Sequence, residues 1–160
     1  SGDIDPAIPF FLERELKMDL TTIDKLLNKK SGLKGICGKN DIRDISKLSK
    51  SGDEKATLAL KIYSYRIKKY LGAYLTLLPK LDTLIFTAGI GENSTLVRSM
   101  ILKDLHHLGI HLDQEKNENV KRGIIQEIQA GKKEQKLTKI LVVPTDEEKE
   151  IASQTKAILN

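Results

Sequence analysis

Two short apolar runs constrain the fold of this 160-residue chain more than any other feature of its sequence. Residues 83–87 read Thr-Leu-Ile-Phe-Thr and residues 139–143 read Lys-Ile-Leu-Val-Val, and a turn and a helical pattern follow each run. Continuous apolar runs of this length are typical of strands that are buried on both faces of a sheet. Strands separated by helices predict an α/β fold in which at least part of the sheet is parallel.

The other segments carry helical periodicity, with apolar residues at steps of three and four. We expect helices over residues 6–17, 41–48, 54–78, 96–101 and 145–158. A further short helix should begin at a cap at Thr21 or Thr22 and end before residues 31–32. The longest of them should bury the face that carries Leu60, Tyr63, Ile67, Leu71, Tyr74 and Leu78.

The remaining segments have weaker patterns. Glycine at every third position predicts an irregular loop or a short strand for residues 32–40. We expect a further short strand at residues 109–112, and residues 113–139 form the most polar part of the chain.

Composition excludes several classes of protein. Hydrophobic residues at 39% and charged residues at 31% exclude a disordered tail, because such tails lack the apolar side chains that offset chain entropy. No apolar run approaches the roughly 18 to 20 residues of a membrane span. The single cysteine, Cys37, cannot form an intramolecular disulfide, so we expect a soluble cytoplasmic protein. Nucleic acid is a weak hypothesis despite the net charge of +5, because aromatic residues make up only 4% of the chain.

The end of the first strand carries a glycine pattern. In open α/β sheets, ligands bind at the carboxyl ends of strands, where helices begin and present unpaired N–H groups. Gly89-Ile90-Gly91 follows the first strand, and glycine lets the main chain approach a nucleotide without an intervening Cβ. The pattern is not a P-loop, since no Gly-Lys-Ser/Thr follows, nor the dinucleotide fingerprint, since Ser94 stands at the third glycine position. Taken alone, it fits a purely structural turn equally well.

The end of the second strand carries three carboxylates, in Thr145-Asp146-Glu147-Glu148. Thr145 and Glu148 have the spacing of a capping box, and the helix dipole favours acidic residues in a first turn. Glu147 is left without a structural role in this pattern. It is therefore the candidate metal ligand, directly or through water.

Other residues that could carry chemistry have simpler interpretations. Asp41-Ile42-Arg43-Asp44 indicates a helix cap followed by a surface charge set. The histidines at 106, 107 and 111 lack the ligand spacing of a zinc site. We expect Cys37 to be a small buried residue.

Five segments that follow one another along almost the whole chain form a recognisable set. They are residues 1–6 (Ser-Gly-Asp-Ile-Asp-Pro), 27–32 (Leu-Asn-Lys-Lys-Ser-Gly), 41–44 (Asp-Ile-Arg-Asp), 86–94 (Phe-Thr-Ala-Gly-Ile-Gly-Glu-Asn-Ser) and 144–148 (Pro-Thr-Asp-Glu-Glu). Together they resemble the carboxy-terminal portion of the acetate kinase family. The resemblance implies part of a ribonuclease H-like, actin-like ATPase domain of the sugar kinase, heat-shock protein 70 and actin superfamily. In that superfamily two related domains clamp a nucleotide and Mg²⁺.

The resemblance also implies roles for particular residues. The adenosine contacts of the family fall on Asp41, Ile42 and Arg43, the remaining nucleotide contacts fall on Gly89, Ile90, Gly91, Glu92 and Asn93, and the Mg²⁺-linked glutamate is Glu147. Two positions depart from the family pattern, since Asp146 stands where Asn is usual and Ile42 where Phe or another apolar residue is usual. Neither departure removes the nucleotide hypothesis.

The reaction that the resemblance implies is reversible phosphoryl transfer from ATP to acetate, which gives ADP and acetyl phosphate. The family's amino-terminal domain, with its catalytic Asp and substrate-orienting arginines, would precede residue 1. We therefore expect residues 1–160 to be a nucleotide-binding portion that contains no catalytic residue and is inactive alone.

Several alternatives stay open at this point. Propionate and butyrate kinases share much of the pattern, so the acyl chain length is not decided. A non-catalytic nucleotide-binding or regulatory module is the alternative from another class. The resemblance further implies a homodimer built through this domain, to which the helix at 54–78 could contribute, and no nucleic-acid or membrane partner.

Overall fold

The computed structural model describes residues 1–131 and 138–159, and the chain forms two compact units, Ser1–Ser64 and Tyr65–Asn160. The first unit is helical. It contains α1 (Ile8–Leu16), α2 (Leu20–Lys29), α3 (Leu33–Cys37), α4 (Ile42–Lys50) and the first part of α5 (Glu54–Leu75). Its buried apolar residues are Ile23, Ile42, Ile45, Ala56, Ala59 and Leu60.

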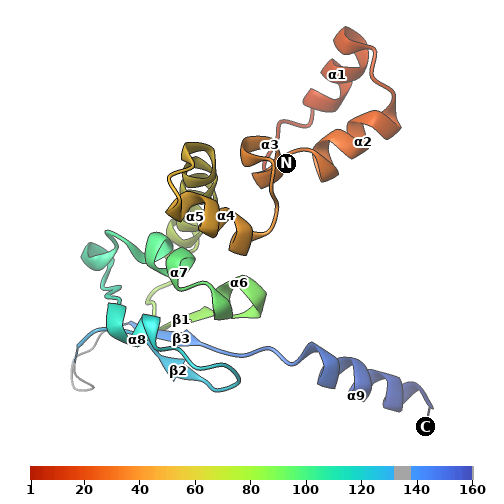
Figure 1. The fold of residues 1–160 in the computed structure, drawn as a ribbon. Coiled ribbons are helices and arrows are strands. Elements are labelled where there is room, and N and C mark those ends of the chain that lie inside the picture. The colour runs from red at the N-terminus through yellow and green to blue at the C-terminus, as the bar shows by residue number, and fades with distance from the viewer. Residues whose placement is uncertain (132–137, 160) are drawn as a thin grey trace. The chain divides into compact units, whose positions relative to one another are not determined.

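The second unit holds a three-stranded sheet in the order β1–β3–β2 (Figure 1). β1 (Thr83–Phe86) and β3 (Lys139–Val142) are parallel, and Phe86 pairs with Val142. β2 (Gln126–Glu127) is antiparallel to β3. The parallel pairing of the two apolar runs confirms the α/β arrangement predicted from them.

Helices follow both parallel strands of the second unit. After β1 come α6 (Ala88–Asn93), α7 (Thr95–Leu102), the 3₁₀ helix η1 (His106–Leu108) and α8 (Gln114–Glu118), and after β3 comes α9 (Glu147–Leu159). The buried apolar residues of this unit are Phe86, Val97, Ile101, Leu102, Leu105, Ile110, Ile128, Ile140 and Val142. In α9, whose residues all belong to the described part, none is buried.

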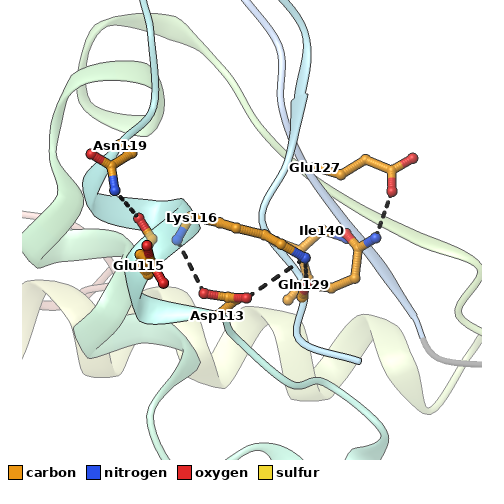
Figure 2. A network of polar contacts seen from close by, with 7 residues as sticks. All are labelled: Asp113, Glu115, Lys116, Asn119, Glu127, Gln129 and Ile140. Carbon is orange, nitrogen blue, oxygen red and sulfur yellow. Dashed lines mark hydrogen bonds and ion pairs between the residues drawn. The ribbon is translucent and has the colours of Figure 1, made fainter. Parts of the chain in front are cut away.

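A polar network fixes α8 to the sheet (Figure 2). The Nζ atom of Lys116 donates to the carbonyl of Gln129 at 2.9 Å and lies 3.6 Å from Oδ2 of Asp113. Asp113 also caps α8, because its Oδ1 atom accepts from the Lys116 N–H at 3.0 Å. The Gln129 side chain accepts from the Ile140 N–H in β3 and donates to Glu127 in β2, at 3.0 and 2.7 Å. The start of α8 is thus joined to both of these strands.

The prediction for residues 32–40 is wrong, because Leu33–Cys37 form a helix. Gly32 and Gly38 lie just outside its two ends, with φ angles of +64° and +75°. Glycine is the residue that adopts positive φ at the lowest cost, and the left-handed conformation of Gly38 is common just after the last turn of a helix. The spacing of the glycines therefore reflects caps rather than a chain that avoids the helix.

Two predictions about burial hold only in part, because Leu60 and Phe86 are buried as expected and other residues of the predicted faces are exposed. The buried residues of α5 are Ala56, Ala59, Leu60 and Ser64, whereas Tyr74 is 61% exposed, and the helix ends at Leu75 rather than at residue 78. In β1, Phe86 is buried but Ile85 is 54% exposed. The described residues thus cover only one face of this strand, which was expected to be buried on both.

Smaller differences concern helix caps and the polar stretch. Asp19 caps α2 in place of Thr21 or Thr22, since its Oδ1 atom accepts from the Thr22 N–H at 2.7 Å. The strand expected at residues 109–112 is a single bridge between Leu112 and Gln129. The stretch 113–139 contains α8 and β2, and its residues 132–137 lie outside the described part. Cys37 is half-buried rather than buried.

Candidate functional site

The glycine segment after β1 is a short helix. Thr87 is extended, with φ at −147°, and Ala88 has a φ of +59°, in the left-handed region. An L-residue in this region costs about 1–2 kcal/mol, and such strain is concentrated at functional sites. The reversal at Ala88 lets α6 begin directly at the carboxyl end of β1. The segment expected to be a turn is thus an additional helix ahead of the one expected at 96–101.

The two glycines of α6 differ in their surroundings. A Cβ added at Gly91 would lie 3.2 Å from the carbonyl carbon of Phe86, so this glycine is needed for the close approach of α6 to the end of β1. A Cβ added at Gly89 would meet no atom within 4 Å, and the φ angle of Gly89 is not positive. The described chain gives no packing reason for glycine at 89. Its open side is available to a ligand.

A hydrogen-bonded link joins the carboxyl ends of the two parallel strands. The Oε1 atom of Glu92, in α6, accepts from the N–H of Thr145 at 2.8 Å and from its Oγ1 at 2.7 Å. Below this link, the Val143 N–H donates to the carbonyl of Phe86 at 2.9 Å. The glycine segment and the carboxylate segment, predicted separately, therefore lie together at this edge of the sheet.

Asn93 also has a partner within the chain. Its Nδ2 atom donates to the carbonyl of Gly89 at 2.9 Å, so the side chain folds back on α6. Of the five residues predicted to follow the nucleotide along this segment, Glu92 and Asn93 thus already make polar contacts that hold the segment together.

The first turn of α9 differs from the predicted capping box. Asp146 caps the turn, because its Oδ1 atom accepts from the Lys149 N–H at 2.9 Å, whereas Thr145 is bound to Glu92. The predicted pairing of Thr145 with Glu148 is therefore wrong. Glu147 is exposed at the first position of α9, two residues beyond the link to α6.

Asp41 and Arg43 form an exposed pair at the start of α4. Asp41 caps the helix, since its Oδ1 atom accepts from the Arg43 N–H at 2.8 Å, and its Oδ2 atom lies 2.5 Å from Nη2 of Arg43. The Arg43 side chain, and then its backbone N–H, lowers the pKa of Asp41 to about 2. Ile42, between them, is 6% exposed and packs in the core of the first unit. These three residues belong to the first unit, and the glycine segment and Glu147 to the second.

Two residues that support the site were missed by sequence reasoning. Arg98, on α7, and Asn117, on α8, are 1% and 0% exposed and bind each other. Arg98 precedes the buried residues Ile101 and Leu102 by three and four positions, so it lies on the same apolar face of α7. An arginine on an apolar helix face was the sequence signal that could have identified it.

The described residues fit a metal ion that is shared with phosphates and water, and they do not fit a metal site made of protein ligands alone. Within residues 1–131 and 138–159, no group of three or more His, Cys, Asp or Glu could hold a metal ion. Mg²⁺ in phosphoryl-transfer sites is usually bound by one or two carboxylates together with phosphates and water. The exposed carboxylate of Glu147 fits that mode, whereas a site made entirely of protein ligands does not fit. His106 and His111 line a separate cavity of about 480 Å³, which none of the predicted site residues lines.

A parallel strand pair whose carboxyl ends lead into a glycine helix and an acidic helix start places the second unit in the α/β class, and this arrangement is consistent with an actin-like ATPase domain. Comparisons with solved structures agree with this class. The crystal structure of Porphyromonas gingivalis acetate kinase is similar over 100% of this chain and 39% of the P. gingivalis chain, with a TM-score of 0.83 and 43% identity. A propionate kinase from Francisella tularensis matches 92% of this chain and 36% of that chain, with a TM-score of 0.82 and 40% identity.

The sequence comparisons define the family. The acetokinase family model matches residues 1–153, and this chain belongs to that family. The acetate kinase of Sulfurovum sp. (strain NBC37-1) is 51% identical over 161 residues, which cover 100% of this chain and 40% of that protein. The acetate kinase of Campylobacter lari is 48% identical over 158 residues, which cover 99% and 39%. The chain thus spans about 40% of the length of these relatives. Among the described residues, no helix is both long and apolar enough to cross a membrane.

Proposed function

We propose that this chain is the nucleotide-binding portion of a carboxylate kinase that catalyses reversible phosphoryl transfer from ATP to acetate. One observation carries the nucleotide assignment. Gly89 lies at the end of β1 with open space where a Cβ would be, in the helix that Glu92 links to the end of β3. The backbone there can approach phosphates, at the strand ends where ligands bind in open α/β sheets.

The proposed roles of the residues follow from their chemistry. The backbone of residues 89–93 lies along the nucleotide, and Asp41, Ile42 and Arg43 contact the adenosine. Ile42 is 6% exposed as a whole residue, so it would offer the adenosine only a small part of its surface. Glu147 would hold Mg²⁺, which neutralises phosphate charge when it is bound with the nucleotide. None of the roles proposed here falls on the acceptor carboxylate.

The chain alone is proposed to be inactive. Phosphoryl transfer depends on positioning and charge stabilisation around two oxygens in line, and the roles assigned here cover only the nucleotide side. The names of the relatives support acetate or propionate as acceptor, and we propose acetate because the sequence relatives reported above are acetate kinases. A homodimer is proposed for the complete protein, with support from exposed Leu58, Ile62 and Tyr65 on α5. The single cysteine supports a reducing cytoplasm as its location.

Two measurements on the 160-residue chain test the proposal. Titration with MgADP, followed by NMR of the amides at residues 89–93, should give saturable shifts with millimolar affinity, since half of a two-domain clamp lacks the contacts of the other half. Trapping acetyl phosphate as its hydroxamate should detect no product. Absence of MgADP-dependent shifts would overturn the nucleotide assignment. Product formation that Gly91→Val abolishes would overturn the proposed inactivity.

The second candidate function is nucleotide binding without any role in catalysis. Turnover of a full-length kinase of the family that carries this segment distinguishes the two functions. A regulatory module predicts unchanged turnover when Glu147 is replaced, whereas the carboxylate kinase predicts a large loss.

A further inference from the structure

A buried guanidinium lies at the carboxyl end of the glycine helix. Arg98 is 1% exposed, and its Nη1 atom donates to the carbonyl of Gly91 at 2.8 Å and to that of Glu92 at 2.9 Å. Carbonyls in the last turn of a helix have no partner further along that helix. Arg98 therefore supplies donors for the end of α6 that the helix itself does not provide.

The other edge of the guanidinium is fixed by Asn117. The Nε atom of Arg98 donates to Oδ1 of Asn117 at 2.7 Å, and its Nη2 atom donates to the Asn117 carbonyl at 3.0 Å. Asn117 is fully buried, and its Nδ2 atom donates to the Thr95 carbonyl at 3.2 Å and to Oγ of Ser99 at 2.9 Å. The side chains of Arg98 and Asn117 thus form a network in which each polar atom of the Asn117 amide group has a partner.

This network is anchored to the sheet. Asn117 belongs to α8, and the start of α8 is joined to β3 through Lys116 and Gln129 (Figure 2). The support of α6 therefore runs from the sheet through α8 to Arg98.

A buried arginine at position 98 destabilises the fold unless its hydrogen bonds are needed. The acceptors around the guanidinium are neutral oxygens, and burial lowers the pKa of Arg98. An apolar residue would suit the buried face of α7 beside Val97 and Ile101 without the cost of removing a charge from water. Arginine is favoured only where its rigid fork of donors is needed.

We infer that Arg98 is a positioning residue for nucleotide binding, which acts through the Gly91 and Glu92 carbonyls to hold α6 and the Gly89 backbone at the end of β1. The inference rests on the proposed nucleotide role of α6. Lysine cannot replace arginine here, because one ammonium group does not span the carbonyls of α6 and the side chain of Asn117 at once.

Hydrogen exchange of the amides at residues 92–94 and NMR titration with MgADP test this inference on the 160-residue chain. In Arg98→Lys, the exchange rate of these amides, divided by that of the β3 amides, should be at least tenfold higher than in wild type. The initial slope of the amide shifts against MgADP concentration should be at least fivefold smaller. Asn117→Ala should change both quantities in the same direction. The double variant should be no worse than Arg98→Lys, because the two residues act as one unit.

Two control variants separate positioning from general loss of stability. Ile101→Val, at a residue 3% exposed on the same helix, should speed exchange evenly through the unit and leave the response to MgADP unchanged. Arg122→Lys, at an exposed arginine, should match wild type. The inference is overturned if Arg98→Lys behaves as Ile101→Val does, or if exchange quickens while the MgADP response stays at the wild-type level. If wild type itself gives no response to MgADP, the proposed nucleotide function fails, and the exchange ratios still decide whether Arg98 holds α6.

Discussion

The Oε1 atom of Glu92 accepts two hydrogen bonds from Thr145, one from its N–H at 2.8 Å and one from its Oγ1 at 2.7 Å. The two residues are 53 positions apart, and the link joins the helix after β1 to the segment after β3. A carboxylate that accepts from backbone and side chain at once fixes the orientation of the acceptor as well as its distance. The link therefore sets where Glu147, two residues further on, begins α9.

Removal of this link should loosen the site while the fold is kept. Glu92→Ala removes both hydrogen bonds and should lower the free energy of unfolding by about 1 kcal/mol, since each exposed bond contributes little net stability. Thr145→Val removes only the bond from Oγ1 and should cost about half as much. Urea unfolding followed by circular dichroism measures both. Glu92→Gln keeps an acceptor and should lie near wild type, so a Gln variant as unstable as the Ala variant would contradict the role given to this bond.

The two glycines of α6 should respond to alanine in opposite ways. Gly91→Ala places a methyl group 3.2 Å from the Phe86 backbone and should cost about 1–3 kcal/mol of stability through overpacking. Gly89→Ala meets open space and should leave stability unchanged or raise it by up to about 1 kcal/mol, because alanine favours helix. We expect Gly89→Ala nevertheless to weaken MgADP binding at least fivefold, because its Cβ lies on the side left open to the ligand.

Gly72→Ala is the matched control for this pair. Gly72 also lies in a helix with no atom within 4 Å of an added Cβ, so it should gain stability as Gly89→Ala does and leave MgADP binding unchanged. Equal MgADP affinity in Gly89→Ala and wild type would show that the open side of α6 does not face the nucleotide.

The parts of this fold that were predictable from sequence are those in which local signals agree with tertiary packing. The apolar runs in β1 and β3 were recognisable without knowledge of their partners, and their parallel pairing followed from the helices between them. β2 was missed, because Gln126 and Glu127 carry no apolar pattern and are held by their neighbour β3.

The candidate site was predictable as two separate segments and not as one assembly. The glycine pattern and the acidic helix start were visible, but the bond between Glu92 and Thr145 depends on strand register, which sequence does not give. Arg98 was overlooked because three of its acceptors are backbone carbonyls and its side-chain partner Asn117 lies 19 residues away, so only its place on an apolar helix face marked it. The Thr145–Glu148 capping box failed for a related reason, since Thr145 is bound to a residue far away in sequence and Asp146 takes its place.

The Asp41–Arg43 pair predicts a measurable dependence of stability on pH. The pKa of Asp41 is lowered from 3.8 to about 2, because Arg43 donates to the carboxylate with its side chain and its backbone N–H. A lowered pKa in the folded state means stability that is present above about pH 4 and is lost as the pH falls toward 2. Asp41→Asn should remove that part of the acid sensitivity.

The measurement is the urea midpoint of wild type and Asp41→Asn between pH 2 and pH 5. The difference between them should shrink toward low pH, and it should shrink at every pH in 1 M salt, since the pair is exposed and therefore screened. Parallel curves for the two proteins over this interval would show that Asp41 does not couple to folding.

The last prediction concerns Glu147, for which a structural and a functional role lead to different results. As an acidic residue in the first turn of α9, Glu147 contributes at most about 1 kcal/mol of stability through the helix dipole. In that case Glu147→Gln leaves turnover nearly unchanged in a full-length kinase of the family that contains this segment. As the proposed Mg²⁺ ligand, Glu147 is needed to place the ion against the phosphates, and its loss leaves developing charge uncompensated. Each 1.4 kcal/mol of lost transition-state stabilisation is tenfold in rate, so we expect a fall in turnover of about a hundredfold or more.

Glu148→Gln is the matched control, because Glu148 is also an exposed first-turn acid on the same helix and Asp146, not Glu148, caps that turn. A dipole effect acts on both glutamates, so it predicts similar small losses in the two variants and the same dependence of turnover on Mg²⁺. A metal ligand predicts a selective loss, in which Glu147→Gln alone needs a higher Mg²⁺ concentration for half-maximal turnover. The assignment to Mg²⁺ is wrong if Glu147→Gln keeps wild-type turnover and Mg²⁺ dependence, or if Glu148→Gln is the more damaged variant.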